Sequence, residues 1–576
     1  MLSIILNWIY IGILVSVVGF AVMQGYLTLL GKENRKESCA GYGIVHVLIA
    51  GIMGTTLYAQ IFSLFYRVNI EANIVLMLLA LLYVLWQKKY IINVLRIWKQ
   101  EFVLPKNWKY VVYVLIVVAV VVFALVSAGP AKLIDTDWYH AQTIRWIEEY
   151  GCVKGVANLF YALGFNNAQH YFDALFSMVW ISGQSMRAGG GFFGLIVFVH
   201  GLLRIARWNT HSQHVADVLA VWEVAYSIIV TAFYTDPYVD TLPNIIVLFI
   251  MTEWIALVEE KSEDTVWFGF YCLLAVFATI CKTSVAPVVL LTVYAVYLLL
   301  KQQRKVQIFW YLGVGFLMAV PFIITNIITS GYPVYLLTAF DVLNAKWKID
   351  PAVLQYCVND MVAAARNPAA THEQVLNCGL SWVPAWFRAE SISHQLLYLA
   401  IAVFVIYDLV FIGIALFKKK DMDFPMLWPR ICVYIGLAYW FFTIPQVKYC
   451  WSFLILATAL APTYYWEKKK AHPLILRGTL ALSGLMLLMY TGFYGLRTLG
   501  YIKDYAPHYL VKQADYTKYT CDMIQKDGQT FYIRFEGGDY VCGYHNFPYL
   551  ENDNDLERLV VGESLDAGFY MENVQD

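Results

Sequence analysis

The sequence has little charge. Only 14% of its 576 residues are Asp, Glu, Lys or Arg, and 60% are hydrophobic, whereas about a quarter of the residues of a soluble domain are charged. The 41 basic and 41 acidic residues cancel, so no net field favours binding to nucleic acid. The composition therefore argues against a soluble domain and indicates an integral membrane protein.

Several short signals are also missing. The chain has no Asn-x-Ser/Thr sequon, which gives no sign of a glycosylated surface and favours a bacterial origin. No glycine-rich nucleotide-binding loop appears in the segments expected in the cytoplasm. The first apolar stretch, 4–30, lacks a basic leader and a small-residue cleavage site, so it predicts a retained span rather than a signal peptide.

Long apolar stretches are abundant instead. A membrane-crossing helix needs about 20 mostly apolar residues, and about 13–15 such helices are predicted, which makes the chain an all-α polytopic membrane protein. One crossing is expected within 170–205, where two apolar runs flank three glycines and one run is expected to be re-entrant. The other predicted spans are 4–30, 41–66, 71–86, 110–128, 215–233, 239–258, 266–281, 285–300, 307–328, 396–417, 427–444, 450–466 and 473–497.

Basic residues collect in alternate loops, which the positive-inside rule places in the cytoplasm. The long segments 129–169 and 329–395 and the C-terminal tail are then extracytoplasmic. We accordingly expect additional N-terminal helices (1–109), a transmembrane module (110–497) and a small α+β extracytoplasmic C-terminal domain (498–576) in a bacterial inner membrane. The basic clusters are Lys32, Arg35 and Lys36; Lys88, Lys89, Arg96 and Lys99; Arg204 and Arg207; Lys301, Arg304 and Lys305; Lys418 to Lys420; and Lys468 to Lys470.

Four cysteines fall in the segments expected outside the cytoplasm. Cys357 and Cys378 share one loop, and Cys521 and Cys542 share the tail. An oxidising compartment would allow each pair to form a disulfide. Four unlinked thiols are the alternative, because spacing in the sequence does not show which Cα atoms approach one another.

A polar, acid-containing loop follows the span at 110–128. Asp135 suits a helix N-cap, and helical spacing then places Asp135, Tyr139 and Gln142 on one face. Such a face could accept a proton from a sugar hydroxyl, bind a divalent cation such as Mg or Mn, or orient a phosphate. Asp137 is a second acid in the same loop. The alternative is an interfacial amphipathic helix with a capping Asp and a belt of aromatic residues.

Two more acids lie between later spans. Asp236 precedes Pro237, and Asp240 sits deeper in apolar sequence, where a carboxylate is costly and therefore a functional candidate. Lys282 and Lys448 lie at corners between spans on the same side. They could hold a lipid phosphate, or extend to the lipid headgroups. Helix capping is the alternative for both acids.

Other polar and aromatic segments complete the candidates. Asn166 lies in a glycine- and amide-rich loop, and Tyr332 and Trp347 lie in the long loop 329–395, where aromatic faces suit either carbohydrate stacking or headgroup anchoring. In the tail, 530–535 and 558–561 have the composition of strands.

An early acid after a span, a second acid between later spans and an otherwise helical chain resemble the GT-C superfamily of membrane glycosyltransferases. The chain looks closest to an uncharacterised family of large bacterial membrane proteins related to GT-C enzymes, with departures at Asp137, where that family has a non-acid, and at Lys448, where it has an arginine. The segments that carry this likeness are Asp135-Thr136 with Tyr139-His140 and Trp146, Gly164-Phe165-Asn166, Ser330-Gly331-Tyr332-Pro333 with Trp347-Lys348, and Gly538-Asp539 with Cys542.

The resemblance implies an inverting transfer of a sugar from a polyprenyl-phosphate donor to a glycan, lipid or protein acceptor. It implies Asp135 as the base or metal-positioning acid, with Asp137 as the alternative, and Asp240 or Asp236 as the second acid. Residues implied in substrate binding are Tyr139, His140, Asn166, Asp236, Asp240, Lys282, Lys448, Tyr332 and Trp347.

Two other classes of function stay open. A lipid-glycan flippase or transporter would carry charged residues inside several spans and a repeated helix pattern, and the sequence shows few such charges and no evident repeat. A glycan polymerase or ligase would depend on basic residues in the long loop. Those residues are Arg366, His372, Arg388 and His394.

Overall fold

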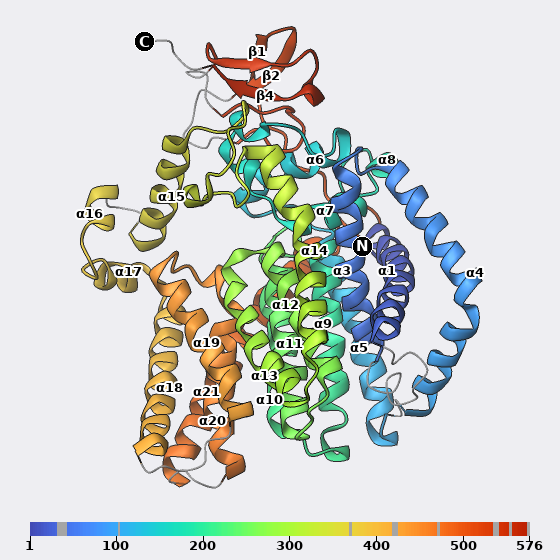
Figure 1. The fold of residues 1–576 in the computed structure, drawn as a ribbon, viewed down its shortest axis with the longest axis vertical. Coiled ribbons are helices and arrows are strands. Elements are labelled where there is room, and N and C mark those ends of the chain that lie inside the picture. The colour runs from blue at the N-terminus through green and yellow to red at the C-terminus, as the bar shows by residue number, and fades with distance from the viewer. Residues whose placement is uncertain are drawn as a thin grey trace.

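The computed structural model describes residues 1–30, 43–101, 104–367, 371–417, 424–468, 473–533, 541–551 and 556–572. Helices make up 72% of the chain. A helical bundle carries a small region of β-structure at one end, at the top of Figure 1. The basic clusters predicted at 32–36, 418–420 and 469–470 lie outside the described residues.

Among the described residues, ten helices are long and apolar enough to cross a membrane, and three shorter apolar helices accompany them. The chain is therefore a helical protein with the composition of a membrane protein. The helices of the bundle are α1 (Leu2–Leu29), α3 (Ile44–Ser63), α4 (Ile70–Glu101), α5 (Lys106–Ser127), α9 (Gly189–Ile205), α10 (His214–Ile229), α11 (Thr241–Glu259), α12 (Thr265–Cys281), α13 (Thr292–Lys301), α14 (Lys305–Ser330), α18 (Ile392–Phe417), α19 (Phe424–Phe442), α20 (Trp451–Lys468) and α21 (Pro473–Tyr505).

Short helices make up most of the connections at the end nearest the β-structure. They include one π-helix, η1 (Thr136–His140), and several single turns of 3-10 helix. The short α-helices are α6 (Ala141–Glu149), α7 (Ala168–Leu175), α8 (Val179–Ser182), α15 (Pro351–Arg366), α16 (His372–Leu376) and α17 (Val383–Ala389); the 3-10 segments are η2 (Val156–Asn158), η3 (Tyr161–Gly164), η4 (Trp208–Thr210), η5 (Val230–Phe233), η6 (Thr283–Leu291), η7 (Thr338–Phe340), η8 (Val447–Tyr449) and η10 (Leu565–Ala567).

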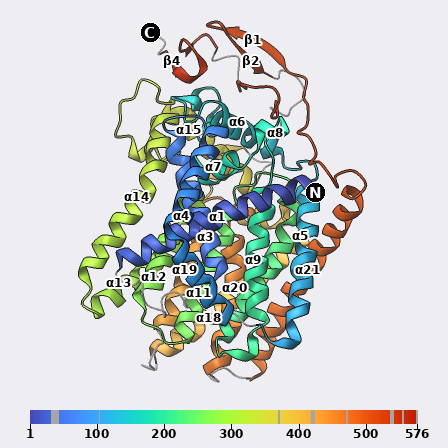
Figure 2. The same cartoon turned by 90° about the vertical axis from the view of Figure 1, so that its right-hand side faces the viewer.

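Small residues let the first two helices pack closely. A Cβ atom on Gly19 of α1 would lie 1.9 Å from the carbonyl oxygen of Val47, and a Cβ on Gly51 of α3 would lie 1.8 Å from that of Val15. The two backbones therefore touch at both points, as small residues allow between apolar helices. In Figure 2 these two helices cross the face of the bundle.

The segment 170–205 contains one long helix. The run beginning at Tyr171 forms the short helices α7 and α8, whose chain turns back at Met178 and Gly183 with positive φ values of 51° and 73°. The second run forms α9, which is 17 residues long. α9 is one of the shorter apolar helices, so the single crossing predicted for this segment stays a prediction.

The C-terminal region contains two antiparallel two-stranded sheets, β1 (Asp522–Lys526) with β2 (Gln529–Ile533), and β3 (Leu559–Val561) with β4 (Phe569–Met571). The tail strands predicted at 530–535 and 558–561 overlap β2 and β3, and residues 534–535 lie outside the described residues. Helix α21 runs past the predicted boundary at 498 to Tyr505. The strands bury an aromatic core shared with the loop after α6, in which Trp146 and Phe160 pack with Phe531 and Phe569.

The structure decides between the two cysteine pairings. Cys357 and Cys378 are free thiols, and Cys378 donates to the carbonyl of Val375 instead, so the pairing predicted in the long loop is wrong. Cys521 and Cys542 are also thiols, but their sulfur atoms lie 2.8 Å apart. The tail pair is therefore placed in direct contact.

Candidate functional site

The acid-containing loop after α5 is a π-helical turn. Residues 136–140 form η1, which runs directly into α6. A π-turn holds more residues than an α-turn, so it shifts the register of the side chains that follow it. The amide of Gln142 consequently points to the C-terminal region, where it donates to the carbonyls of Gly543 and Asn546. The prediction that Gln142 shares a face with Asp135 and Tyr139 is wrong for this reason.

Asp135 does not cap the helix. Its side chain makes no capping hydrogen bond and instead accepts from Lys448 Nζ at 3.0 Å. A second pair joins Lys282 Nζ to Asp240 Oδ1, also at 3.0 Å. Residues far apart in the sequence therefore form two acid–lysine pairs.

The two pairs lie close together because both lysines flank one ring. Lys282 Nζ is 4.7 Å and Lys448 Nζ 5.2 Å from the centroid of Tyr449. Burial opposes the charging of Lys448, but neighbouring Tyr449 and the carboxylates of Asp135 and Asp240 raise its pKa above the ordinary value. Lys448 is therefore a permanent cation at physiological pH.

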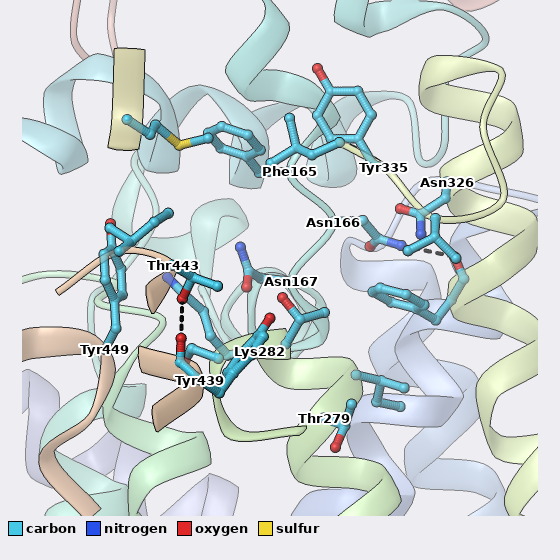
Figure 3. A pocket seen from close by; sticks show the side chains of 18 of the residues that line it. Phe165, Asn166, Asn167, Thr279, Lys282, Asn326, Tyr335, Tyr439, Thr443 and Tyr449 are labelled. Atoms are coloured by element: carbon cyan, nitrogen blue, oxygen red, sulfur yellow. Dashed lines mark hydrogen bonds between the residues drawn. The ribbon is translucent and has the colours of Figure 1, made fainter. Parts of the chain in front are cut away.

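A pocket of about 220 Å³ adjoins these pairs. Tyr139, Asn166 and Lys282 of the predicted residues line it, together with Tyr449, and Figure 3 shows the labelled side chains around it. Of the four paired residues only Lys282 is among the lining residues; Asp135, Asp240 and Lys448 lie beside the pocket rather than in its wall. The volume is below the roughly 300–1,000 Å³ of pockets for drug-sized ligands. The pocket therefore has room for one small group of a substrate.

Two amide oxygens in this pocket have no donor. Asn166 Nδ2 donates to the Phe322 carbonyl at 3.0 Å, and Asn326 Nδ2 donates to the Pro333 carbonyl at 3.1 Å. In both side chains Oδ1 is buried and has no hydrogen-bond partner among the described residues. Because an unpaired buried acceptor is costly, the pocket is suited to a ligand that brings hydroxyl or amide donors.

Asp137 points away from the pocket, contrary to its predicted catalytic role. Its carboxylate accepts from Tyr519 Oη at 2.7 Å, and its carbonyl accepts from the backbone of Gly543 at 3.1 Å. Burial raises its pKa, although the hydrogen bond from Tyr519 opposes this shift. Asp137 therefore fastens the C-terminal region to the bundle.

Asp236 is also structural. It accepts hydrogen bonds from the backbone amides of Lys132 and Leu133 and from the hydroxyls of Thr136 and Thr235. Its side chain is 1% exposed, and it does not line the pocket. These hydrogen bonds tie the loop after α5 to the segment that carries Asp236, and its role in substrate binding stays a prediction.

His140 lies behind the pocket. Its Nδ1 is 2.8 Å from His170 Nε2, and both rings are buried. Burial, reinforced by the charge of Lys282, lowers the pKa of His170 to about 3 and that of His140 well below its usual range. Both imidazoles are therefore neutral, and His140 supports Tyr139, whose ring lies 4.0 Å from it.

Tyr332 and Trp347 do not line the pocket either. Tyr332 Oη donates to the carbonyl of Ile349 at 3.2 Å, and Trp347 Nε1 donates to that of Ile327 at 2.8 Å. Both residues hold the start of the long loop against α14, and their contact with substrate stays a prediction.

The donor set does not fit a divalent cation. Asp135 and Asp240 are each neutralised by a lysine, whereas Mg²⁺ needs oxygen ligands without a competing cation. Among the described residues no group of three or more His, Cys, Asp or Glu could hold a metal ion. The predicted metal role of these two acids is therefore not supported by this geometry.

Sequence reasoning missed several lining residues. Asn326 was detectable, because an amide inside an apolar span is costly, and it belongs to α14. The others lacked any periodic signal and come from four segments that only the fold brings together. They are Asn167, Tyr335, Met361, Tyr439, Trp440, Thr443 and Tyr449.

The basic residues of the long loop pair with their neighbours. His372 lies 3.1 Å from Asp360 and His394 lies 2.8 Å from Glu390, and Arg388 donates to the carbonyl of Pro384. Neither they nor Arg366 line the pocket. This arrangement does not favour the polymerase or ligase hypothesis.

Charged residues inside the helices are more numerous than the sequence indicated. Asp408 of α18 and Arg430 of α19 form a pair at 2.6 Å with exposures of 0% and 2%. Helices α9, α10 and α11 contribute His200, Glu223 and Glu253 to a second cluster. The expectation of few such charges is wrong, because buried pairing lets apolar segments carry them.

Residues 1–455 match the family described as "Domain of unknown function (DUF8201)", and the chain belongs to that family. No curated protein and no solved structure matches the chain. The match includes both acid–lysine pairs and ends before the C-terminal sheets.

Proposed function

We propose that this member of the family is a membrane glycosyltransferase that moves a sugar from a polyprenyl-phosphate donor to an extracytoplasmic glycan, lipid or protein acceptor, with inversion at the anomeric carbon. The observation that carries the proposal is the pairing of Asp135 with Lys448 and of Asp240 with Lys282 beside a small pocket with unpaired acceptors. We also propose a bacterial inner-membrane location with this end of the bundle outside the cytoplasm.

In this proposal Asp135 is the general base. Its carboxylate takes the proton of the acceptor hydroxyl while the acceptor oxygen attacks the anomeric carbon. The bond from that carbon to the phosphate oxygen breaks, and the electron pair leaves with the lipid phosphate. Lys282 and Lys448 stabilise the phosphate as its charge develops.

The pocket supports a sugar at this position. Aromatic rings of Phe165, Tyr335 and Trp440 line it, and aromatic faces pack on the apolar faces of a sugar ring. The unpaired oxygens of Asn166 and Asn326 would accept from sugar hydroxyls. Burial raises the pKa of Tyr139 well above its ordinary value, so its phenol would remain a hydrogen-bond donor.

The test is donor turnover by the purified chain with a panel of polyprenyl-phosphate sugars. We expect Asp135→Asn to lower turnover by about 10²–10⁴-fold, the range for loss of a general base. Asp341→Asn is the matched control, because Asp341 forms a 3.0 Å pair with Lys348 and does not line the pocket. Equal turnover by wild type and Asp135→Asn would contradict the assignment of the base.

The buried charges favour a second candidate, a lipid-glycan flippase or transporter, because ionisable residues within helices often mark transport pathways. The two candidates differ in their products. A transporter moves labelled lipid-linked sugar across a vesicle membrane without cleaving it, whereas the transferase releases lipid phosphate. Movement of intact donor, with no release of lipid phosphate by any donor tested, would favour the transporter.

A further inference from the structure

A second polar cluster lies at the opposite end of the bundle from the pocket. Helix α12 begins after Asp264, which lines a cavity of about 670 Å³, and ends at the residues that line the pocket. At about 1.5 Å per residue, its 17 residues separate the two regions by roughly 25 Å. The cavity is therefore distinct from the proposed active site.

An imidazole lies between two carboxylates in this cluster. His200 Nδ1 is 2.6 Å from Glu223 Oε2, and His200 Nε2 is 3.1 Å from Glu253 Oε1. His200 is 6% exposed and Glu223 is fully buried. Each ring nitrogen therefore faces a carboxylate oxygen at hydrogen-bonding distance.

Counting donors shows that one more proton is needed. A neutral imidazole has a single N–H, and an ionised carboxylate only accepts. A neutral His200 between ionised Glu223 and Glu253 would place a ring lone pair against a carboxylate oxygen. The geometry is satisfied only when an additional proton resides on the imidazole or on one of the two carboxyl groups.

That proton reduces the excess of negative charge in the cluster. Arg204 Nη1 donates to Glu253 at 2.9 Å, and its Nε lies 3.7 Å from Asp217. Without the proton, three carboxylates would face one arginine in these pairs, at a burial where unpaired charge is costly. The other titratable or charged groups that face the cluster or its cavity are His46 of α3, Tyr113 of α5, Arg207, His211, His214, Glu260, Asp264 and Tyr271 of α12.

The cavity gives the cluster access to water. His46, His200 and Glu253 line it, and its volume holds many water molecules at about 30 Å³ each. His46 Nε2 is 3.0 Å from Tyr271 Oη and 3.6 Å from Glu253 Oε2. Hydrogen-bonding groups therefore continue from the triad along the cavity wall.

We propose that His200, Glu223 and Glu253 form a proton-binding site that exchanges its proton with water in this cavity. The proposal does not depend on glycosyl transfer, because it rests on a separate set of residues. The site binds its proton more tightly in the folded chain than the free side chains do, since both carboxylates stabilise the imidazolium.

The first test is the pH dependence of thermal unfolding in detergent. Because the folded site keeps a proton that a free histidine releases near pH 6.5, the stabilisation is complete below about pH 6.5 and decreases as pH rises above it. We expect the unfolding midpoint of the wild type to fall above about pH 6.5, and His200→Gln to flatten that fall.

The matched control is His372→Gln, which removes an imidazole that contacts one carboxylate, Asp360, through one nitrogen. It should keep the wild-type pH dependence. An unchanged pH dependence in His200→Gln would overturn the proposal.

A second measurement covers the case in which His200→Gln does not fold. Histidine nitrogen NMR and infrared spectra of the wild-type chain near pH 8 report the proton directly. We expect either an imidazole with two N–H groups or a protonated buried carboxyl group, and the absence of both would overturn the proposal.

Discussion

The pair of Asp135 and Lys448 allows a quantitative test that separates catalysis from stability. Their atoms lie 3.0 Å apart, and their side chains are 23% and 32% exposed. Exposed pairs contribute about 0–1 kcal/mol, and breaking a fully buried pair costs about 3–5 kcal/mol. Asp135→Asn should therefore lower the free energy of unfolding by about 1–3 kcal/mol.

The double variant measures the coupling. Lys448→Met leaves Asp135 without its partner, so it should also destabilise the chain. The changes in unfolding free energy caused by substituting two residues in contact do not add. The double variant Asp135→Asn with Lys448→Met should therefore lose about 1–2 kcal/mol less than the sum of the two single losses. Denaturant unfolding in detergent measures these energies.

Activity should behave differently. The double variant recovers stability but lacks both the base and a phosphate-binding cation, so turnover should stay at least about 10²-fold below wild type. Asp341→Asn breaks a pair of the same length and similar exposure, 32% and 22%, and should lose stability without losing turnover. If the two single losses of unfolding free energy add within about 0.5 kcal/mol, Asp135 and Lys448 do not interact. If the double variant recovers turnover, the roles proposed for Asp135 as base and Lys448 as phosphate-binding cation are wrong.

Three further predictions concern other parts of the chain. Asp408→Ala removes the carboxylate that pairs with the buried Arg430 and should cost about 3–5 kcal/mol of unfolding free energy. A loss below about 1 kcal/mol, measured by thermal unfolding, would contradict it. Burial raises the pKa of Glu148 to about 7. The free energy of unfolding should therefore fall by about 3 kcal/mol as pH rises from about 4.5 to 7. Glu148→Gln should remove that part of the pH dependence, and an unchanged curve of unfolding free energy against pH would show that Glu148 titrates normally. Asp137→Asn weakens the hydrogen bond from Tyr519, so limited proteolysis should cleave the C-terminal region faster than in wild type. Donor turnover should fall by less than about tenfold. A loss of turnover as large as that of Asp135→Asn would show that Asp137 takes part in catalysis.

Hydropathy alone predicted the helical class. Apolar stretches such as those that became α5 and α11 need no tertiary context, because a helix satisfies its own backbone hydrogen bonds. The tail strands at 530–535 and 558–561 were also predicted from local composition, and they appear as β2 and β3. The boundary at 498 was early, because α21 continues into polar sequence as far as Tyr505.

The candidate site was predicted only in part. Asp135, Asp240, Lys282 and Lys448 stood out as charges beside apolar sequence, but their spacing did not show which acid meets which lysine. The sequence also did not show that the side chains of Asp137, Asp236, Tyr332 and Trp347 form hydrogen bonds with neighbouring groups of the protein.

The sequence by itself determined that the chain is apolar, helical and marked by a few charges next to its spans, because these properties depend on composition and on neighbours within one helical turn. The tertiary structure alone decided that Asp135 meets Lys448 across 313 positions, and that Asn166 and Asn326 line the same pocket. It also decided that His200 lies between Glu223 and Glu253. Contacts of this kind depend on how helices pack, since the partners in each of them come from different segments of the chain.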